Sequence, residues 1–260
     1  MVKLYRKYLA LQVKSAFEYR ASLIFDMISG SLTTIASFFA IFLLFKNYET
    51  IGGYSFSEVL ITYALVNFTF SVAECMFRGF DTFDKLVRTG ELDRLLIRPR
   101  SVFLQVLGHK IELNKIGRIL FSGAVLIWAC ANLSITWTVI KLLVILLMVL
   151  GSIIVFAGMF LLFSSMCIFT VEGIEVVNVI TNGGRDLAQY PIDVYSGFFR
   201  KVFTYIIPLG VVNYLPLQYL LGFSNATIWH ALSPLLSIVF FAICFFIFKW
   251  SLTKYKSTGS

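Results

Sequence analysis

Charged residues are scarce in this chain of 260 residues, at 14% of the sequence. An ordinary soluble domain carries about 25%. Hydrophobic residues make up 58%, and 27 of them are phenylalanine. A chain of this composition lacks the polar surface that a water-soluble domain needs, so the sequence excludes that class.

Histidine and cysteine are also sparse, with two and four residues. His109 and His230 have no acidic or cysteine partner at metal-ligand spacing, and the cysteines form no C-x-x-C pair. We therefore expect neither a metal site nor a disulfide framework. The sequence also lacks a G-x-x-x-x-G-K-[ST] phosphate loop and an identifiable Ser/His/Asp arrangement, so we expect no cofactor and no catalytic residue in this chain.

Long apolar blocks separated by basic hinges are what the sequence does contain. Residues 21–45 and 141–169 each exceed the roughly 20 residues that cross a hydrocarbon core about 30 Å thick. The sequence thus predicts an all-α polytopic membrane protein, with a single transmembrane domain over residues 1–260. The six predicted spans are residues 21–45, 58–77, 116–133, 141–169, 172–190 and 228–248.

The basic residues lie mainly on one predicted side of the membrane. Five Lys and Arg residues fall in 1–20, nine in 78–118 and three after residue 248, which places 17 of the 22 on that side. Cytoplasmic loops carry such an excess, so we expect both termini in the cytoplasm. This pattern accounts for the net charge of +8 without a nucleic-acid partner.

Two further segments differ from the spans. Residues 1–20 interleave leucine and aromatic residues with lysine and arginine at helical spacing, which predicts an amphipathic interfacial helix in contact with lipid. Residues 191–227 contain Pro191, Pro208 and Pro216, which interrupt any single spanning helix. We expect short outer-leaflet helices there, covered by other spans or lining a cavity.

Residues 81–100 form the readable part of the main cytoplasmic loop. Asp81 is a suitable cap for a short helix, and Gly90 is a suitable left-handed stop. Leu92, Leu95 and Leu96 then share one face of a second short helix. Two interpretations remain open: a loop held on the membrane surface by leucines and lipid-binding arginines, or a docking helix for a cytoplasmic protein.

Polar residues inside spans one and five are the other candidates, because lipid does not solvate them. They either line a conduit or pack against a second membrane subunit, and they are Ser29, Thr33, Ser37, Asn178, Asn182, Arg185 and Asp186. For Glu74 and Arg78, near a predicted inner end, we favour interfacial solvation and helix contacts.

The loop and the later chain carry a family resemblance. The run from Gly90 to Pro99, GELDRLLIRP, resembles the G-x-L-D-x-L-L-x-x-P segment of ABC-2 type permeases. The stretch from Tyr190 to Tyr195, together with Ile207-Pro208 and Tyr214-Leu-Pro216, resembles their region after span five. The similarity extends over essentially the whole chain.

This resemblance implies a permease that pairs with a second permease, identical or homologous, and with two ABC ATPase subunits that bind ATP and magnesium. It implies that the loop forms a coupling helix seated in the ATPase, and that the helices after span five narrow the outer exit. The coupling residues so implied are Asp84, Leu86, Val87, Gly90, Leu92, Asp93, Leu95, Leu96, Arg98 and Pro99.

The expected function is export of a hydrophobic or amphipathic substrate, such as a drug, an antimicrobial peptide, a lipid or a lipid-linked glycan. The expected location is the cytoplasmic membrane of a bacterium or archaeon. Two alternatives remain: a noncatalytic scaffold whose basic loop recruits a cytoplasmic regulator, and a proton-coupled carrier that uses Asp186 or Glu175.

Overall fold

All of the regular secondary-structure elements in the described residues are helices. A computed structural model describes residues 2–133, 135–170, 174–195 and 197–257, with the backbone alone at 2–4 and 174–179. Within these residues no strand forms, and a single isolated bridge joins Ile51 to Tyr54. The predicted all-α class is therefore confirmed.

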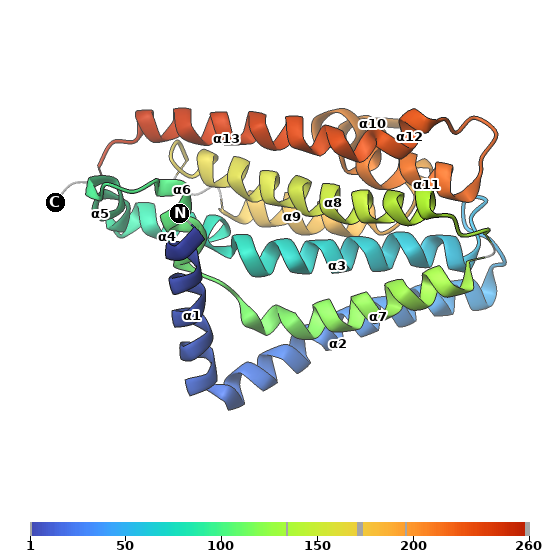
Figure 1. The fold of residues 1–260 in the computed structure, drawn as a ribbon, viewed down its shortest axis with the longest axis horizontal. Helices are drawn as coiled ribbons and strands as arrows, with labels where there is room; N and C mark the ends of the chain where they lie inside the picture. Colours follow the sequence, from blue (N-terminus) through green and yellow to red (C-terminus); the bar gives the residue numbers. More distant parts are fainter. Residues whose placement is uncertain (1, 134, 171–173, 196, 258–260) are drawn as a thin grey trace.

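Five segments are long and apolar enough to cross a membrane: Arg20–Asn47, Phe56–Arg88, Leu113–Asn132, Val139–Met166 and Ile228–Lys254. Their main helices are α2 (Arg20–Asn47), α3 (Phe56–Asp81), α7 (Ile116–Asn132), α8 (Val139–Met166) and α13 (Leu236–Lys254). In Figure 1 these helices run along the long axis of the molecule.

The remaining helices have 17 residues or fewer and gather mostly at the ends of the bundle, apart from α9. They are α1 (Val2–Glu18), α4 (Phe83–Arg88), α5 (Glu91–Ile97), α6 (Val102–His109), η1 (Leu113–Lys115), α9 (Ile174–Ala188), η2 (Ile192–Val194), α10 (Gly197–Lys201), η3 (Val202–Ile206), η4 (Gly210–Tyr214), α11 (Leu215–Leu221), α12 (Ile228–Leu232) and η5 (Ser233–Leu235). Helices α1 and α4–α6 lie at one end and α10–α12 at the other (Figure 1).

The predicted fifth span does not reach span length within the described residues. Helix α9 has 15 residues there, which is about 22 Å at 1.5 Å per residue. It nevertheless packs against α3 and α8 inside the bundle. Glu172 lies outside the described residues, as do the side chains of Glu175 and Asn178.

Local sequence explains where several helices begin and end. Ser55 and Glu58 form a capping box at the start of α3, in which the Ser55 backbone N–H donates to Glu58 Oε2 at 2.7 Å. Gly52 and Gly53 make the preceding turn with φ angles of 60° and 85°. Pro234 lies in η5, where the predicted sixth span divides into α12 and α13.

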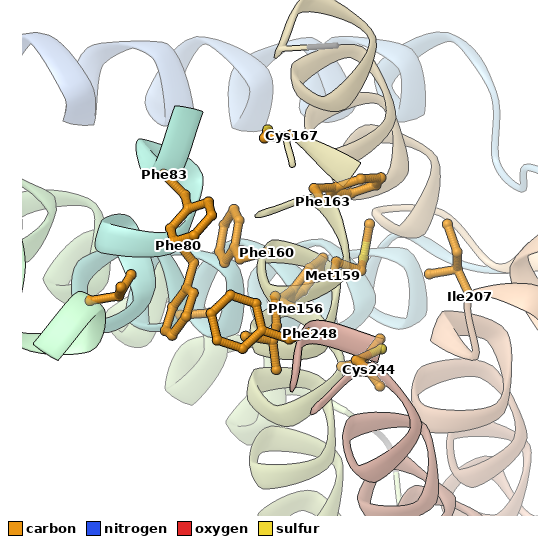
Figure 2. Close-up of a cluster of buried hydrophobic side chains, with 14 of the residues drawn as sticks. Phe80, Phe83, Phe156, Met159, Phe160, Phe163, Cys167, Ile207, Cys244 and Phe248 are labelled. Carbon is orange, nitrogen blue, oxygen red and sulfur yellow. The ribbon is translucent and has the colours of Figure 1, made fainter. Parts of the chain in front are cut away.

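Helix α3 is the centre of the bundle, and α2 is at its edge. In the most apolar window of each span, 78% of the residues are buried for the α3 segment and 11% for α2. Two hydrophobic clusters pack on opposite halves of α3. In the first, shown in Figure 2, Phe80 and Phe83 contact Phe248 of α13. This cluster joins the last span to the start of the 81–100 loop.

Candidate functional site

The 81–100 loop folds as two short helices, α4 and α5, which follow the carboxyl end of α3. Thr82 occupies the N-cap position of α4, so the predicted capping role of Asp81 is wrong. Asp81 is instead the last residue of α3, where its carboxylate pairs with Arg78 one turn earlier. Gly90 has a φ of 71°, which confirms the predicted left-handed stop between α4 and α5.

Most apolar residues of the loop face into this chain. Leu92 is fully buried and Leu95 is 9% exposed, whereas Leu96 is 40% and Ile97 84% exposed. Asp84, Leu86 and Val87 of α4 are also buried. The surface that remains for a partner therefore consists of Leu96 and Ile97 together with exposed charged or turn residues: Lys85, Arg88, Thr89, Glu91, Arg94, Arg98, Pro99 and Arg100.

Two contacts hold α5 in place from outside the loop. Gln105 of α6 donates through Nε2 to the backbone oxygens of Leu95 at 3.0 Å and Arg100 at 3.2 Å. Ser257, after α13, donates through Oγ to Asp93 Oδ2 at 2.6 Å. Ser257 therefore lies beside α5, which is at the same end of the bundle as α1 (Figure 1).

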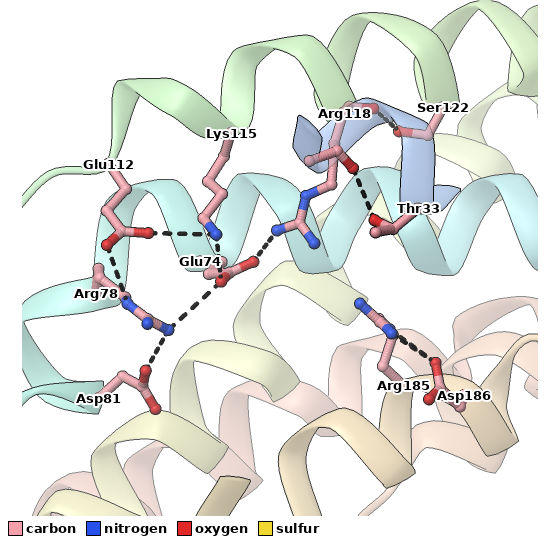
Figure 3. Close-up of polar contacts among 11 residues, drawn as sticks. Thr33, Glu74, Arg78, Asp81, Glu112, Lys115, Arg118, Ser122, Arg185 and Asp186 are labelled. Carbon is pink, nitrogen blue, oxygen red and sulfur yellow. Dashed lines mark hydrogen bonds and ion pairs between the residues drawn. The ribbon is translucent and has the colours of Figure 1, made fainter. Parts of the chain in front are cut away.

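An ionic cluster lies next to this loop, where the last turns of α3 meet η1 and the start of α7. Glu74 is at its centre: Oε1 lies 2.9 Å from Lys115 Nζ and 3.4 Å from Arg78 Nη1, and Oε2 pairs with Arg118 (Figure 3). Glu74 and Arg118 are 6% and 8% exposed. Burial of such charges is tolerated only when they are paired, so the cluster fixes α7 against α3.

Glu112 is the second carboxylate that binds several cations in the ionic cluster. Its Oε1 lies 3.2 Å from Arg78 Nε and 2.9 Å from Lys110 Nζ, and its Oε2 lies 3.3 Å from Lys115 Nζ. Burial raises the pKa of the Glu112 carboxyl, but the neighbouring cations outweigh burial and bring the pKa below 4.5. This pairing contributes stability above about pH 4.5 that is lost as the pH falls.

For Glu74 and Arg78 we expected interfacial solvation and helix contacts: the structure has the helix contacts, whereas Glu74 is buried and the ionic cluster was not anticipated. A signal was present, because Glu74, Arg78 and Asp81 follow one another at i, i+4 and i+7 on one face of an apolar helix. Lys115 and Arg118 have the matching spacing at the start of the next span. Complementary charges on consecutive spans indicate a contact between them.

The polar candidates of α2 and α9 are placed separately. Ser29, Thr33 and Ser37 are exposed on α2, where Thr33 Oγ1 donates to the Gly30 oxygen at 2.8 Å and Ser37 Oγ to the Thr33 oxygen at 3.1 Å. These bonds satisfy the hydroxyls of Thr33 and Ser37 within their own helix. The α2 face is thereby compatible with lipid or with a protein partner.

On α9, Asn182 is exposed, and Arg185 pairs with its neighbour Asp186 at 2.7 Å (Figure 3). The Arg185 guanidinium also lies 5.2 Å from the ring centre of Phe70, near the middle of α3. Arg185 is thus directed into the bundle. The end of α2 and the chain after α9 approach each other at the other end, where Leu44 and Tyr190 line one groove.

Among the described residues, no group of three or more His, Cys, Asp and Glu side chains is arranged to hold a metal ion. The four cysteines are free, and Cys167 and Cys244 are buried. The described residues offer contact surfaces and a set of ion pairs that joins the helices.

Comparison with family models identifies the family of this chain. The family model described as ABC-2 family transporter protein matches residues 31–259, which run from within α2 to beyond α13 and include the 81–100 loop and the ionic cluster. No curated protein and no solved structure matches the chain.

Proposed function

Because the chain belongs to the ABC-2 family of transporter proteins, we propose that it is the permease of an ATP-driven exporter, powered by two separate ATP-binding subunits. Family membership and the apolar helices make it an integral membrane transport protein. ATP and magnesium would bind to the partner subunits, since this sequence has no phosphate loop. The proposed substrate is hydrophobic or amphipathic.

The observation that carries the ATPase partnership is the exposed tip of α5. Ile97 is 84% exposed beside Leu96, although the other leucines of this helix are buried. Gln105 and Ser257 fix the backbone and side chains around the tip, so it is a pre-formed docking surface. Helix α5 contacts α4, and α4 contacts α3, so a movement of the ATPase at this surface would be passed to the central span. This connection favours a transporter over a noncatalytic scaffold, because a scaffold does not need to pass movement to its central span.

Leu96→Asp is expected to weaken binding of the cognate ATPase by about 10- to 30-fold, the typical loss at an interface anchor, and to abolish ATP-dependent transport. Leu96 is 40% exposed, so the chain should still reach the membrane and purify as one species. Leu96→Met is the matched control, because it keeps an apolar side chain of similar volume. Normal ATPase binding and transport by Leu96→Asp would contradict the docking assignment.

We propose the six-span topology, with both termini and the 81–100 loop in the cytoplasm. Single cysteines placed at Ser57, Ser101 and Ser224, in a chain without its four native cysteines, provide the measurement. A membrane-impermeant thiol reagent added to intact cells should label positions 57 and 224 but not 101. Labelling at Ser101 from outside would exclude this topology.

A second permease is proposed to cover α2, which is the least buried span and presents hydroxyls along its exposed face. Cysteine at Ser37 or Asn182 should form crosslinks between two permeases in the membrane. A cysteine at Leu146, exposed on α8, is the control for random collisions. Full ATP-dependent transport by a single permease reconstituted with its ATPase would eliminate this arrangement.

A further inference from the structure

Two hollows share lining residues. They lie near α10 and α11, and Figure 1 shows these helices at the end of the bundle opposite α1. One is a narrow cavity of about 20 Å³ between α3, the end of α9 and the chain from Tyr190 to Leu217. The other is a more open groove of about 480 Å³ beside the end of α2. Tyr190 and Tyr195 line both, so these two side chains form the partition between them.

Asn213 gives the cavity a hydrogen-bond donor. The residue is 3% exposed, and its Oδ1 accepts a hydrogen bond from Ser152 Oγ at 2.6 Å. Within the described part of the chain, its Nδ2 has no hydrogen-bond partner. A buried donor without an acceptor is costly, so the site gains free energy when an acceptor oxygen enters.

The walls set the rest of the chemistry. Among the described residues, neither hollow is lined by a charged side chain, and aromatic and aliphatic groups dominate both. A charged ligand would lose its hydration there without a counter-charge, which disfavours it strongly. The groove lies in the size range of small-molecule sites, whereas the cavity accommodates only a small group.

We propose that the cavity and groove together form a substrate site for an uncharged apolar molecule that carries one acceptor oxygen, such as an ester or ketone. The acceptor occupies the cavity and receives a hydrogen bond from Asn213 Nδ2, while the apolar body fills the groove. Tyr190 and Tyr195 must move apart to admit it. This inference rests on the proposed function and specifies the substrate class for it.

The experiment uses two photoreactive probes on the purified full chain in lipid nanodiscs. One is a medium-chain methyl ester with a diazirine beside the ester, and the other is the same chain without the ester. Mass spectrometry should locate the ester label within residues 187–217, at least fivefold above the hydrocarbon label. Asn213→Leu should remove this preference, and Tyr195→Ala should increase ester labelling by opening the partition.

Asn213→Ala provides a smaller second variant that also lacks the donor, so it decides the question if Asn213→Leu fails to fold. Equal labelling of residues 187–217 by both probes in the unaltered chain would overturn the proposal. An ester preference that survives both substitutions would also overturn it, because binding of the ester would then not depend on the Asn213 Nδ2 donor. Labelling needs no ATPase, so its failure is distinct from a failure of Leu96→Asp to disrupt ATPase binding.

Discussion

Replacing Glu74 with alanine is expected to lower the stability of the folded chain by about 3–5 kcal/mol, the usual cost of removing one member of a buried ion pair. Glu74 is 6% exposed and contacts Arg78, Lys115 and Arg118. Arg118 has no other ion-pair partner among the described residues, so the substitution leaves a buried guanidinium without its counter-charge. Thermal unfolding of the detergent-purified chain should show a midpoint lower by roughly 10 °C.

The matched control removes both charges. Glu74→Leu combined with Arg118→Leu should recover most of the loss, because apolar residues can replace a buried ion pair at little cost. Lys115 and Arg78 keep Glu112, and Arg78 keeps Asp81. If Glu74→Ala alone unfolds at the unaltered midpoint, the ionic cluster does not hold α7 to α3. If the double variant is no better than the single one, the loss comes from altered helix contacts and not from an unpaired charge.

The long helices were predictable because the apolar blocks are long and have clear ends. Helix α7 runs from Ile116 to Asn132 and α8 from Val139 to Met166, each within three residues of the predicted span at both ends. Gly90 was predictable for a similar reason, since a left-handed stop strongly favours glycine. Length and local backbone preference are sufficient for such features.

The contacts of individual side chains in the 81–100 loop could not be predicted from the spacing of its residues. Leu92, Leu95 and Leu96 share a helical face, yet only the first two are buried. A helix of seven residues has no pattern long enough to show where its buried face ends, and neighbouring elements decide that boundary. The capping role of Asp81 failed similarly, because Arg78 offered its carboxylate a stronger partner. The Glu74–Arg118 pair joins positions 44 residues apart, so the charge spacing indicates a contact between the two spans but not which residues pair.

The second large effect is expected at Gly79, near the end of α3. A Cβ atom at this position would lie 1.9 Å from the backbone oxygen of Val106 in α6, far inside any permitted contact. Because a backbone atom cannot rotate away, Gly79→Ala must push α6 from α3, at a cost of about 1–3 kcal/mol. Gln105 of α6 anchors the end of α5, so the same displacement should disturb the docking surface.

The expected result of Gly79→Ala is a chain that is less stable and binds its ATPase poorly, although residue 79 lies outside the docking surface. Gly183→Ala in α9 is the matched control, since no atom lies within 4 Å of its added Cβ. The control should be unchanged or stabilised by up to about 1 kcal/mol, because alanine favours a helix over glycine. Unfolding midpoints and ATPase pull-down of both variants provide the measurement. Equal behaviour of the two variants would show that α3 and α6 are free to separate, and that the position of α5 does not depend on their contact.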